Sequence, residues 1–477
     1  MKIIFTLFLV ALSFCGKTQG YKIVLQTPNY KSGLAYLTYH MGKNLNVEDS
    51  AAVSNNGTAI FTGTKTLIPG IYALVFPGKN LSADFLIDKE QQIQIKADTV
   101  DLTKMQVSGS PANDLFQEYK KFVAVKGGQL QKERMAYVQS RTKADSVLHE
   151  ANYIAFNKEL NAYRDNIIKN NSSSMMAALL TAMRESPFPT KVPVTHQDSL
   201  DNYNFYKSHY WDGITFMDER ILRTPFFLPK LERYYREVMP QAADSIIKDI
   251  DYKLLLARSA PELYKFLLNW ITDEYLNPKY MGQDAIFVHL FEKYHSKGLS
   301  PWLNEKQMET ITRRAYMQMS NLIGEKAANL EMIDSKGKPA PLYNVNAEYT
   351  VVVFWDPTCG HCKEELPKID SIYRASWKKD NVKIYAVLTE NHVPEWNTYI
   401  KDHNISDWTH VYQTKEMAEA ERAANKAGFR QLYDITQTPI LYLLDKEKRI
   451  VGKKLTWLQL NDLLMVKSKT EKAKTGK

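Results

Sequence analysis

Two cysteines separated by two residues are the side chains in this chain best suited to covalent chemistry. They stand in the segment Cys359-Gly360-His361-Cys362, and the only other cysteine among the 477 residues is Cys15. A disulfide between residues so close in sequence closes a small ring, so it would restrict the unfolded chain little and add little stability. The pair therefore indicates thiol-disulfide exchange and not a structural cross-link.

The surrounding pattern predicts that Cys359 lies where a strand ends and a helix begins. Residues 350–355 form a run typical of a buried strand, and a helix is predicted to open at the motif. A helix N-terminus presents unpaired N–H groups and the positive end of the helix dipole, which both favour a thiolate. We therefore expect Cys359 to be the nucleophile and Cys362, one helical turn further on, to be the resolving thiol. His361 between them is expected to stabilise the thiolate and so the reduced form.

Residues 355–367, with the sequence WDPTCGHCKEELP, resemble the active-site segment of the exported TlpA/ResA group of thioredoxin-like oxidoreductases. The resemblance covers residues 329–466. Residues 391–413 are similar to the helix-plus-strand insertion that this group carries in its central βαβ crossover. The resemblance implies that Thr438 and Pro439 form the cis-proline element of the fold, whose backbone docks an extended substrate beside the cysteine pair.

One departure from the thioredoxin pattern concerns the proton of the resolving thiol. Thioredoxin has a buried acid six residues before its first cysteine, and this chain has Val353 there. Another base, or water, must then serve. The resemblance implies that Glu390, shortly after the predicted strand at 382–388, takes this part; the alternative for Glu390 is an ordinary exposed loop carboxylate. Glu365 suits the dipole of the first helical turn. Trp355 is expected to pack beneath the motif and to support it without reacting.

Hydrophobic periodicity predicts a multidomain fold with a β-sandwich, then an all-α domain, then an α/β thioredoxin-like domain. Alternation such as Gln92-Ile93-Gln94-Ile95-Lys96 is typical of strands, and the spacing lengthens to a helical one after about residue 111. The expected parts are a signal peptide at 1–20, a β-sandwich at 21–108, a helical domain at 109–326, a thioredoxin-like domain at 327–467 and a disordered basic tail at 468–477.

The N-terminus predicts export from the cytosol. Met1-Lys2 is a short basic start, and residues 3–15 are an apolar run too short to span a bilayer, which together are typical of a secretory signal. Cleavage after Gly20 is the preferred interpretation. Lipidation of Cys15, which the bulky Phe14 disfavours, is the alternative and would tether the protein to a membrane. The expected location is the periplasm or cell envelope.

Composition and motif spacing also exclude several partners. The net charge of +9 comes largely from scattered lysines and the C-terminal tail, so no nucleic-acid partner is expected. The expected partners are thiols and disulfides of envelope proteins and a membrane-associated electron donor. No cofactor and no metal are expected, because zinc needs four ligands and covalent haem needs a histidine where Lys363 follows the motif.

The favoured function is an exported thiol-disulfide oxidoreductase that reduces or exchanges disulfides of envelope proteins through a mixed disulfide. One alternative is a thiol peroxidase, although residues 357–359 lack the spacing of the peroxiredoxin motif. The other is an envelope binding or scaffold protein in which the thioredoxin module is accessory. Residues 205–235 crowd aromatic residues with prolines, which fits either core packing or a peptide-binding surface. The direction of the redox chemistry stays open.

Overall fold

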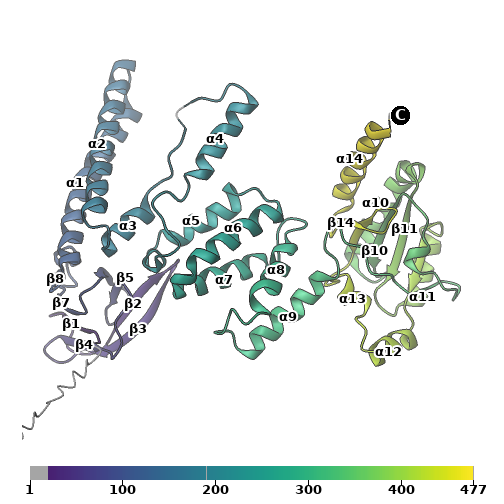
Figure 1. Ribbon diagram of the computed structural model, residues 1–477, viewed down its shortest axis with the longest axis horizontal. Helices are drawn as coiled ribbons and strands as arrows, with labels where there is room; N and C mark the ends of the chain where they lie inside the picture. The colour runs from purple at the N-terminus through teal and green to yellow at the C-terminus, as the bar shows by residue number, and fades with distance from the viewer. Residues whose placement is uncertain (1–19, 190, 476–477) are drawn as a thin grey trace, which may run out of the picture. The chain divides into compact units, whose positions relative to one another are not determined.

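The computed structural model describes residues 20–189 and 191–475, and it divides into two compact units (Figure 1). The first unit ends at Met239 and also includes Lys253–Tyr264; the second consists of Pro240–Tyr252 and the chain from Lys265 onward. This division passes through the predicted helical domain at 109–326, whose boundaries stay a prediction. The predicted signal peptide, with Cys15, lies outside the described residues except for Gly20. None of the helices in the described ranges has an apolar stretch long enough to cross a bilayer.

Two four-stranded sheets in the first unit form the predicted β-sandwich, and their inner faces share one apolar core. In Gln92–Lys96 the isoleucines are buried and the polar residues are exposed, as an alternating strand requires. One sheet contains, in spatial order, β4 (Thr58–Thr62), β1 (Lys22–Gln26), β7 (Gln92–Lys96) and β8 (Gln106–Ser108). The other contains β3 (Asn44–Ala52), β2 (Leu34–Met41), β5 (Gly70–Val75) and β6 (Ser82–Ile87).

Helices follow the sandwich, as the change of periodicity predicts. The first begins at Pro111, where the Ser110 side chain accepts a hydrogen bond from the Asn113 N–H and caps the helix. Figure 1 shows α1 and α2 as a long hairpin, in which Phe122 and Tyr163 stack with ring centroids 4.0 Å apart. The helices of this region are α1 (Pro111–Gln139), α2 (Lys143–Asn170), α3 (Met175–Met183), α4 (His196–Ser208), α5 (Phe227–Arg233), α6 (Ala243–Leu256), α7 (Pro261–Leu276), α8 (Asp284–Leu290) and α9 (Glu305–Met319).

The aromatic-rich segment at 205–235 forms a packed cluster. Tyr210, Phe216 and Phe227 are buried, and the Trp211 ring lies 5.1 Å from both Tyr210 and Phe216, centroid to centroid. Edge-to-face contacts at this distance are typical of aromatic cores. The packing fits the core interpretation of this segment.

A six-stranded mixed sheet forms the centre of the thioredoxin-like domain in the second unit. β10, β11 and β12 run parallel, and β13 pairs antiparallel with β10. Every residue of β10 is buried, as expected for a central strand covered on both faces. The spatial order is β14 (Ile450–Lys453), β13 (Ile440–Leu444), β10 (Tyr349–Trp355), β11 (Val382–Leu388), β12 (Thr409–Tyr412) and β9 (Ile333–Asp334).

Helices cover both faces of this sheet, and each face has its own apolar core. The predicted insertion at 391–413 is confirmed as a helix followed by a strand, and the three-part fold class is confirmed. The backbone is helical to Thr475, which differs from the disordered tail predicted from residue 468 onward. The lysines, glutamate and alanine of this segment are residue types that favour a helix. The helices are α10 (Gly360–Ala375), α11 (Val393–Asp402), α12 (Lys415–Ala423), α13 (Phe429–Leu432) and α14 (Trp457–Thr475).

Candidate active site

Cys359 is the N-cap residue of α10 and follows β10 after a short loop. Its thiol is partly buried, and its Sγ lies 3.4 Å from the carbonyl oxygen of Thr438. Burial raises the pKa of Cys359, but interactions with Thr438 and with the backbone N–H groups of Cys362 and His361 outweigh it, so the pKa lies below the ordinary value. The start of the helix therefore favours the thiolate of Cys359.

Cys362 lies in the first turn of α10 and is 1% exposed. Burial is the largest influence and raises the pKa of its thiol to about 12, although a backbone hydrogen bond from Asp356 works against it. Both thiols are free. One cysteine is therefore accessible and inclined to ionise, and its partner is buried and held in the neutral form.

Thr438 and Pro439 lie beside the motif, as the resemblance implied. The peptide bond between them is cis, and β13 starts directly after Pro439 and runs antiparallel to β10. This arrangement brings the Thr438 carbonyl to the sulfur of Cys359. His361 exposes its side chain to solvent, and its interaction with Cys359 is made by its backbone N–H.

Trp355 ends β10 and is fully buried in the apolar core that also contains Cys362. Its ring packs against Tyr399 of α11, with centroids 5.2 Å apart. Val353 is fully buried in the same core, so the position of the thioredoxin acid is apolar in this chain. At positions 353 and 355, the core that contains Cys362 therefore has an aliphatic and an aromatic side chain, and neither is an acid.

Asp356 and His392 form a pair that sequence reasoning missed. One carboxylate oxygen of Asp356 accepts hydrogen bonds from the N–H and hydroxyl of Thr358, at 2.8 and 2.5 Å, and the other lies 2.9 Å from His392 Nδ1. Burial raises the pKa of Asp356, but these hydrogen bonds hold it below the ordinary value, and the bond to Asp356 raises the pKa of His392. The pair joins the loop before Cys359 to the loop after β11.

The two glutamates named from the sequence lie outside this group of residues. Glu390 exposes more than half of its side chain and pairs with Arg430, which also donates to the Thr389 carbonyl at 2.8 Å. Glu365 pairs with Lys368, with an N–O distance of 2.8 Å. The structure therefore brings together the two cysteines, the cis-proline element and the tryptophan, and it leaves Glu390 in an ion pair at the surface.

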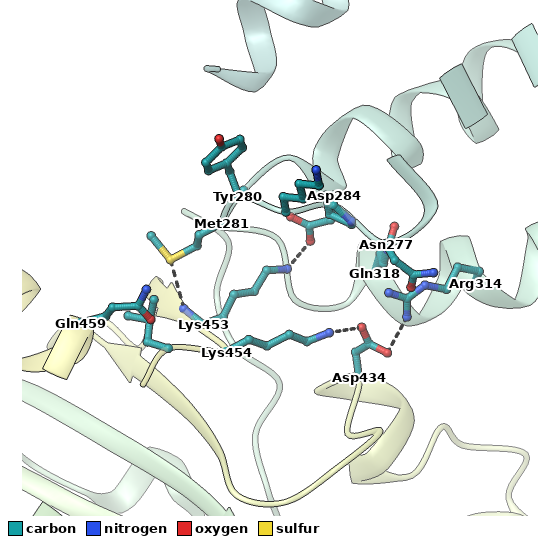
Figure 2. A pocket seen from close by; sticks show the side chains of 14 residues that line it. Asn277, Tyr280, Met281, Asp284, Arg314, Gln318, Asp434, Lys453, Lys454 and Gln459 are labelled. Carbon is teal, nitrogen blue, oxygen red and sulfur yellow. Dashed lines mark hydrogen bonds and ion pairs between the residues drawn. The ribbon is translucent and has the colours of Figure 1, made fainter. Parts of the chain in front are cut away.

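A pocket of about 280 Å³ in the second unit contains neither cysteine (Figure 2). Its charged side chains point toward one another: Lys453 contacts Asp284, and Arg314 and Lys454 both contact Asp434. These ion pairs join α8 and α9 to the thioredoxin-like domain, so the charges are used in packing. Across the ranges that the structure describes, no group of three or more His, Cys, Asp or Glu side chains is placed to hold a metal ion.

Comparison with known families and curated proteins gives matches along most of the chain. Residues 323–453 match the AhpC/TSA family, and residues 21–116 and 156–321 match two domains of unknown function, DUF4369 and DUF5106. The thiol-disulfide oxidoreductase ResA of a Bacillus cereus strain is 23% identical over 131 residues, which spans 28% of this chain and 68% of that protein. ResA of Bacillus anthracis is 22% identical over 129 residues, spanning 27% of this chain and 67% of that protein.

Similar solved structures come from Cytophaga and Bacteroides species. A domain of a possible thiol-disulfide isomerase from Cytophaga hutchinsonii is 37% identical, with a TM-score of 0.28, and covers 32% of this chain and 97% of its own. A thioredoxin-like protein from Bacteroides caccae is 21% identical, with a TM-score of 0.45, and covers 59% of this chain and 99% of its own. The family and curated matches confirm the expected resemblance to the ResA group and the expected oxidoreductase class.

Proposed function

We propose that this chain, a multidomain protein whose C-terminal domain is a TlpA/ResA-like member of the AhpC/TSA family, exchanges or reduces disulfides of envelope proteins after export. The contrast between the two thiols carries the proposal: Cys359 is accessible with a lowered pKa, and Cys362 is buried with a pKa of about 12. A dithiol exchange enzyme needs this contrast, because one thiol attacks as a thiolate while the other stays protonated until it is needed.

In the first step the Cys359 thiolate attacks one sulfur of a substrate disulfide. A bond forms between Cys359 Sγ and that sulfur, the substrate S–S bond breaks, and the second substrate sulfur leaves with the bonding electrons and takes a proton from solvent. We assign Thr438 and Pro439 the docking of an extended substrate segment. The support is the position of the Thr438 carbonyl, 3.4 Å from the attacking sulfur, next to backbone that can pair with another chain.

In the second step Cys362 loses its proton and attacks Cys359 Sγ. The Cys359–Cys362 disulfide forms, the bond to the substrate breaks, and the substrate leaves with two more electrons than it brought. A reductant must then restore the dithiol. We propose a membrane-associated electron donor, because the leader pattern at 1–20 indicates export and thiols outside the cytosol are not kept reduced by the cytosolic systems.

Two further residues, His361 and Trp355, complete the proposal. His361 tunes the stability of the thiolate through its backbone N–H, which interacts with Cys359, and its imidazole is exposed beside the motif. Trp355 fixes the end of β10 behind the resolving thiol. Glu390 is exposed and engaged with Arg430, which gives no support for a part in proton transfer.

A trapping experiment tests this function. The full-length Cys362→Ala variant is expressed in the native host. It should accumulate covalent mixed disulfides with envelope proteins, because the resolving thiol that releases them is missing. The matched variant with both Cys359→Ala and Cys362→Ala should trap none. A set of partners that is non-covalent and identical in both variants would contradict an exchange enzyme and support the binding-protein alternative. Consumption of hydrogen peroxide by the wild type would support the peroxidase alternative.

A further inference from the structure

The resolving step needs a proton acceptor, and the residues named so far do not supply one. The pKa of Cys362 is raised to about 12, so its thiol must give up a proton before it attacks. Val353 replaces the buried acid of thioredoxin. The Asp356 carboxylate already accepts hydrogen bonds from Thr358 and is paired with His392. Unless water alone accepts the proton, the acceptor comes from another part of the fold.

A group of buried polar atoms lies on the same face of the sheet as Cys362. Trp355 packs against Tyr399, and the His410 ring lies 6.3 Å from Trp355 and stacks on Trp408 at 5.7 Å, centroid to centroid. Buried polar atoms ordinarily form hydrogen bonds with other protein atoms or with ordered water, so a buried polar atom without such a bond is unusual. Within the described residues, no hydrogen-bond partner is present for Trp355 Nε1, Trp396 Nε1, Trp408 Nε1, Tyr399 Oη and His410 Nδ1.

His410 is a neutral base whose lone pair can be assigned to one nitrogen. Its Nε2 lies 2.8 Å from the Ile405 carbonyl oxygen, and because a carbonyl only accepts hydrogen bonds, Nε2 must carry the hydrogen. Burial lowers the pKa of His410 to about 4, so the ring is neutral near pH 7. Nδ1 therefore presents a lone pair to the buried core. It is an acceptor in a neighbourhood of indole N–H and phenol donors.

The sheet register places His410 in line with the position of the missing acid. Val353 of β10 is opposite Ala386 of β11, and Ala386 is opposite His410 of β12. Residues in register on neighbouring strands lie on the same face, so His410 and Val353 are two strand spacings, or about 10 Å, apart. Tyr399 covers this face from α11, and it belongs to the same buried core as Trp355 and Cys362. Burial raises the pKa of Tyr399, and the charge of Cys362 adds to this effect.

We propose that His410, acting through Tyr399 and an ordered water, accepts the proton of Cys362 when the mixed disulfide is resolved. This inference rests on the function proposed above. The Tyr399 hydroxyl accepts the Cys362 proton and gives its own proton to the water, which gives one of its protons to His410 Nδ1; a hydroxyl and a water are each both donor and acceptor. Cys362 Sγ then bonds to Cys359 Sγ, the bond to the substrate breaks, and the substrate thiolate leaves with the electron pair. The proton on His410 returns to solvent or to the departing thiolate.

Two titratable side chains, Asp407 and His403, interact with His410 and Tyr399. Asp407 acts on His410, and the His403 ring stacks on Tyr399 at 3.7 Å, centroid to centroid. Because a histidine with so low a pKa is a weak base, we expect an effect near the lower end of the usual range for general-base catalysis, about 10²-fold.

The test separates the two chemical steps in the full-length, reduced protein carrying Cys15→Ser, so that Cys359 and Cys362 are the two thiols that can react. Reaction with Ellman's reagent releases a first coloured thiolate when Cys359 attacks and a second one when Cys362 resolves the mixed disulfide. Tyr399→Phe removes only the hydroxyl, and His410→Gln keeps a donor for the Ile405 carbonyl and removes Nδ1. Each should slow the second release about 10²-fold near pH 7 and leave the first unchanged. The deficit should shrink as pH rises, because hydroxide then removes the proton.

Tyr373→Phe is the matched control, because Tyr373 is a buried tyrosine of the same core, on α10. Both releases should be unchanged in it. A second release at the wild-type rate in Tyr399→Phe, or equal slowing of both releases, would overturn the relay; this variant decides alone if His410→Gln does not fold. If the wild-type protein makes the first release but never the second, the dithiol function itself fails, and the two failures are distinguishable.

Discussion

Replacing Cys359 by serine, in a protein that also carries Cys15→Ser, should leave Cys362 as the one thiol, and it should hardly react with an alkylating agent at neutral pH. Burial is the largest of the influences that raise the pKa of Cys362 from 9.0 to about 12; a hydrogen bond and the charge of Cys359 also raise it, and the substitution removes these two. Each pKa unit lowers the thiolate fraction tenfold at a pH below both values, so the thiolate in the variant is up to about 10³ times scarcer than for an ordinary thiol, a difference of up to about 4 kcal/mol. The side chain is almost inaccessible, which slows alkylation further.

The assay follows iodoacetamide labelling by intact mass from about pH 7 to about pH 10. In Cys359→Ser the logarithm of the rate should rise with pH across the whole range without a plateau. The matched variant Cys362→Ser keeps the thiol with the lowered pKa and should be labelled faster than free cysteine near neutral pH. A plateau below about pH 9 in Cys359→Ser, or equal rates in the two variants, would refute the assignment of nucleophile and resolving thiol.

Three other substitutions test separate parts of the structure. Because the pKa of His392 is raised, its pair with Asp356 stabilises the fold fully below about pH 6.5, and this stabilisation is lost as pH rises through the raised pKa. Because the pKa of Asp356 is lowered, the stabilisation is also lost in acid, as pH falls through that lowered pKa. His392→Gln should therefore lower Tm more at about pH 6 than at about pH 8.5, and equal losses would contradict this. Asp284→Ala leaves the Lys453 ammonium buried without its carboxylate and should cost about 3–5 kcal/mol in urea unfolding; a cost under about 1 kcal/mol would show that the pair is not buried in solution. Glu390→Gln removes an exposed charge and should leave both releases from Ellman's reagent at the wild-type rate, whereas a tenfold slower second release would identify Glu390 as the acceptor.

Sequence patterns predict the structure correctly where it depends on residues that are close along the chain. The buried run predicted at 350–355 is the strand Tyr349–Trp355, and Cys359 is the N-cap residue of the helix that follows, as expected from the end of the apolar run at Trp355. The insertion at 391–413 and the cis-proline element at Pro439 were expected from the resemblance to the TlpA/ResA group, and the structure has both. Periodicity and motif order therefore predict the thioredoxin-like domain and its two thiols.

The polar partners around the thiols were not predictable in the same way. Asp356 and His392 are 36 residues apart, and they meet because parallel strands end at the same edge of the sheet. His410 and Tyr399 come from a strand and a helix whose sequences read as ordinary core, since buried aromatic residues are common. Only register and burial show that their polar atoms share the face behind Cys362.

The equilibrium reduction of the Cys359–Cys362 pair tests the central claim most directly. The full-length protein is equilibrated with glutathione or dithiothreitol buffers, and the oxidised fraction is measured by mass after alkylation. We expect one two-electron transition, about 30 mV for each tenfold change in the ratio, between about −300 and about −120 mV, and its loss in Cys359→Ser. A midpoint near −270 mV would identify a reductase, and one above about −180 mV an oxidant or isomerase. The absence of any transition in this range would contradict thiol-disulfide exchange by this chain.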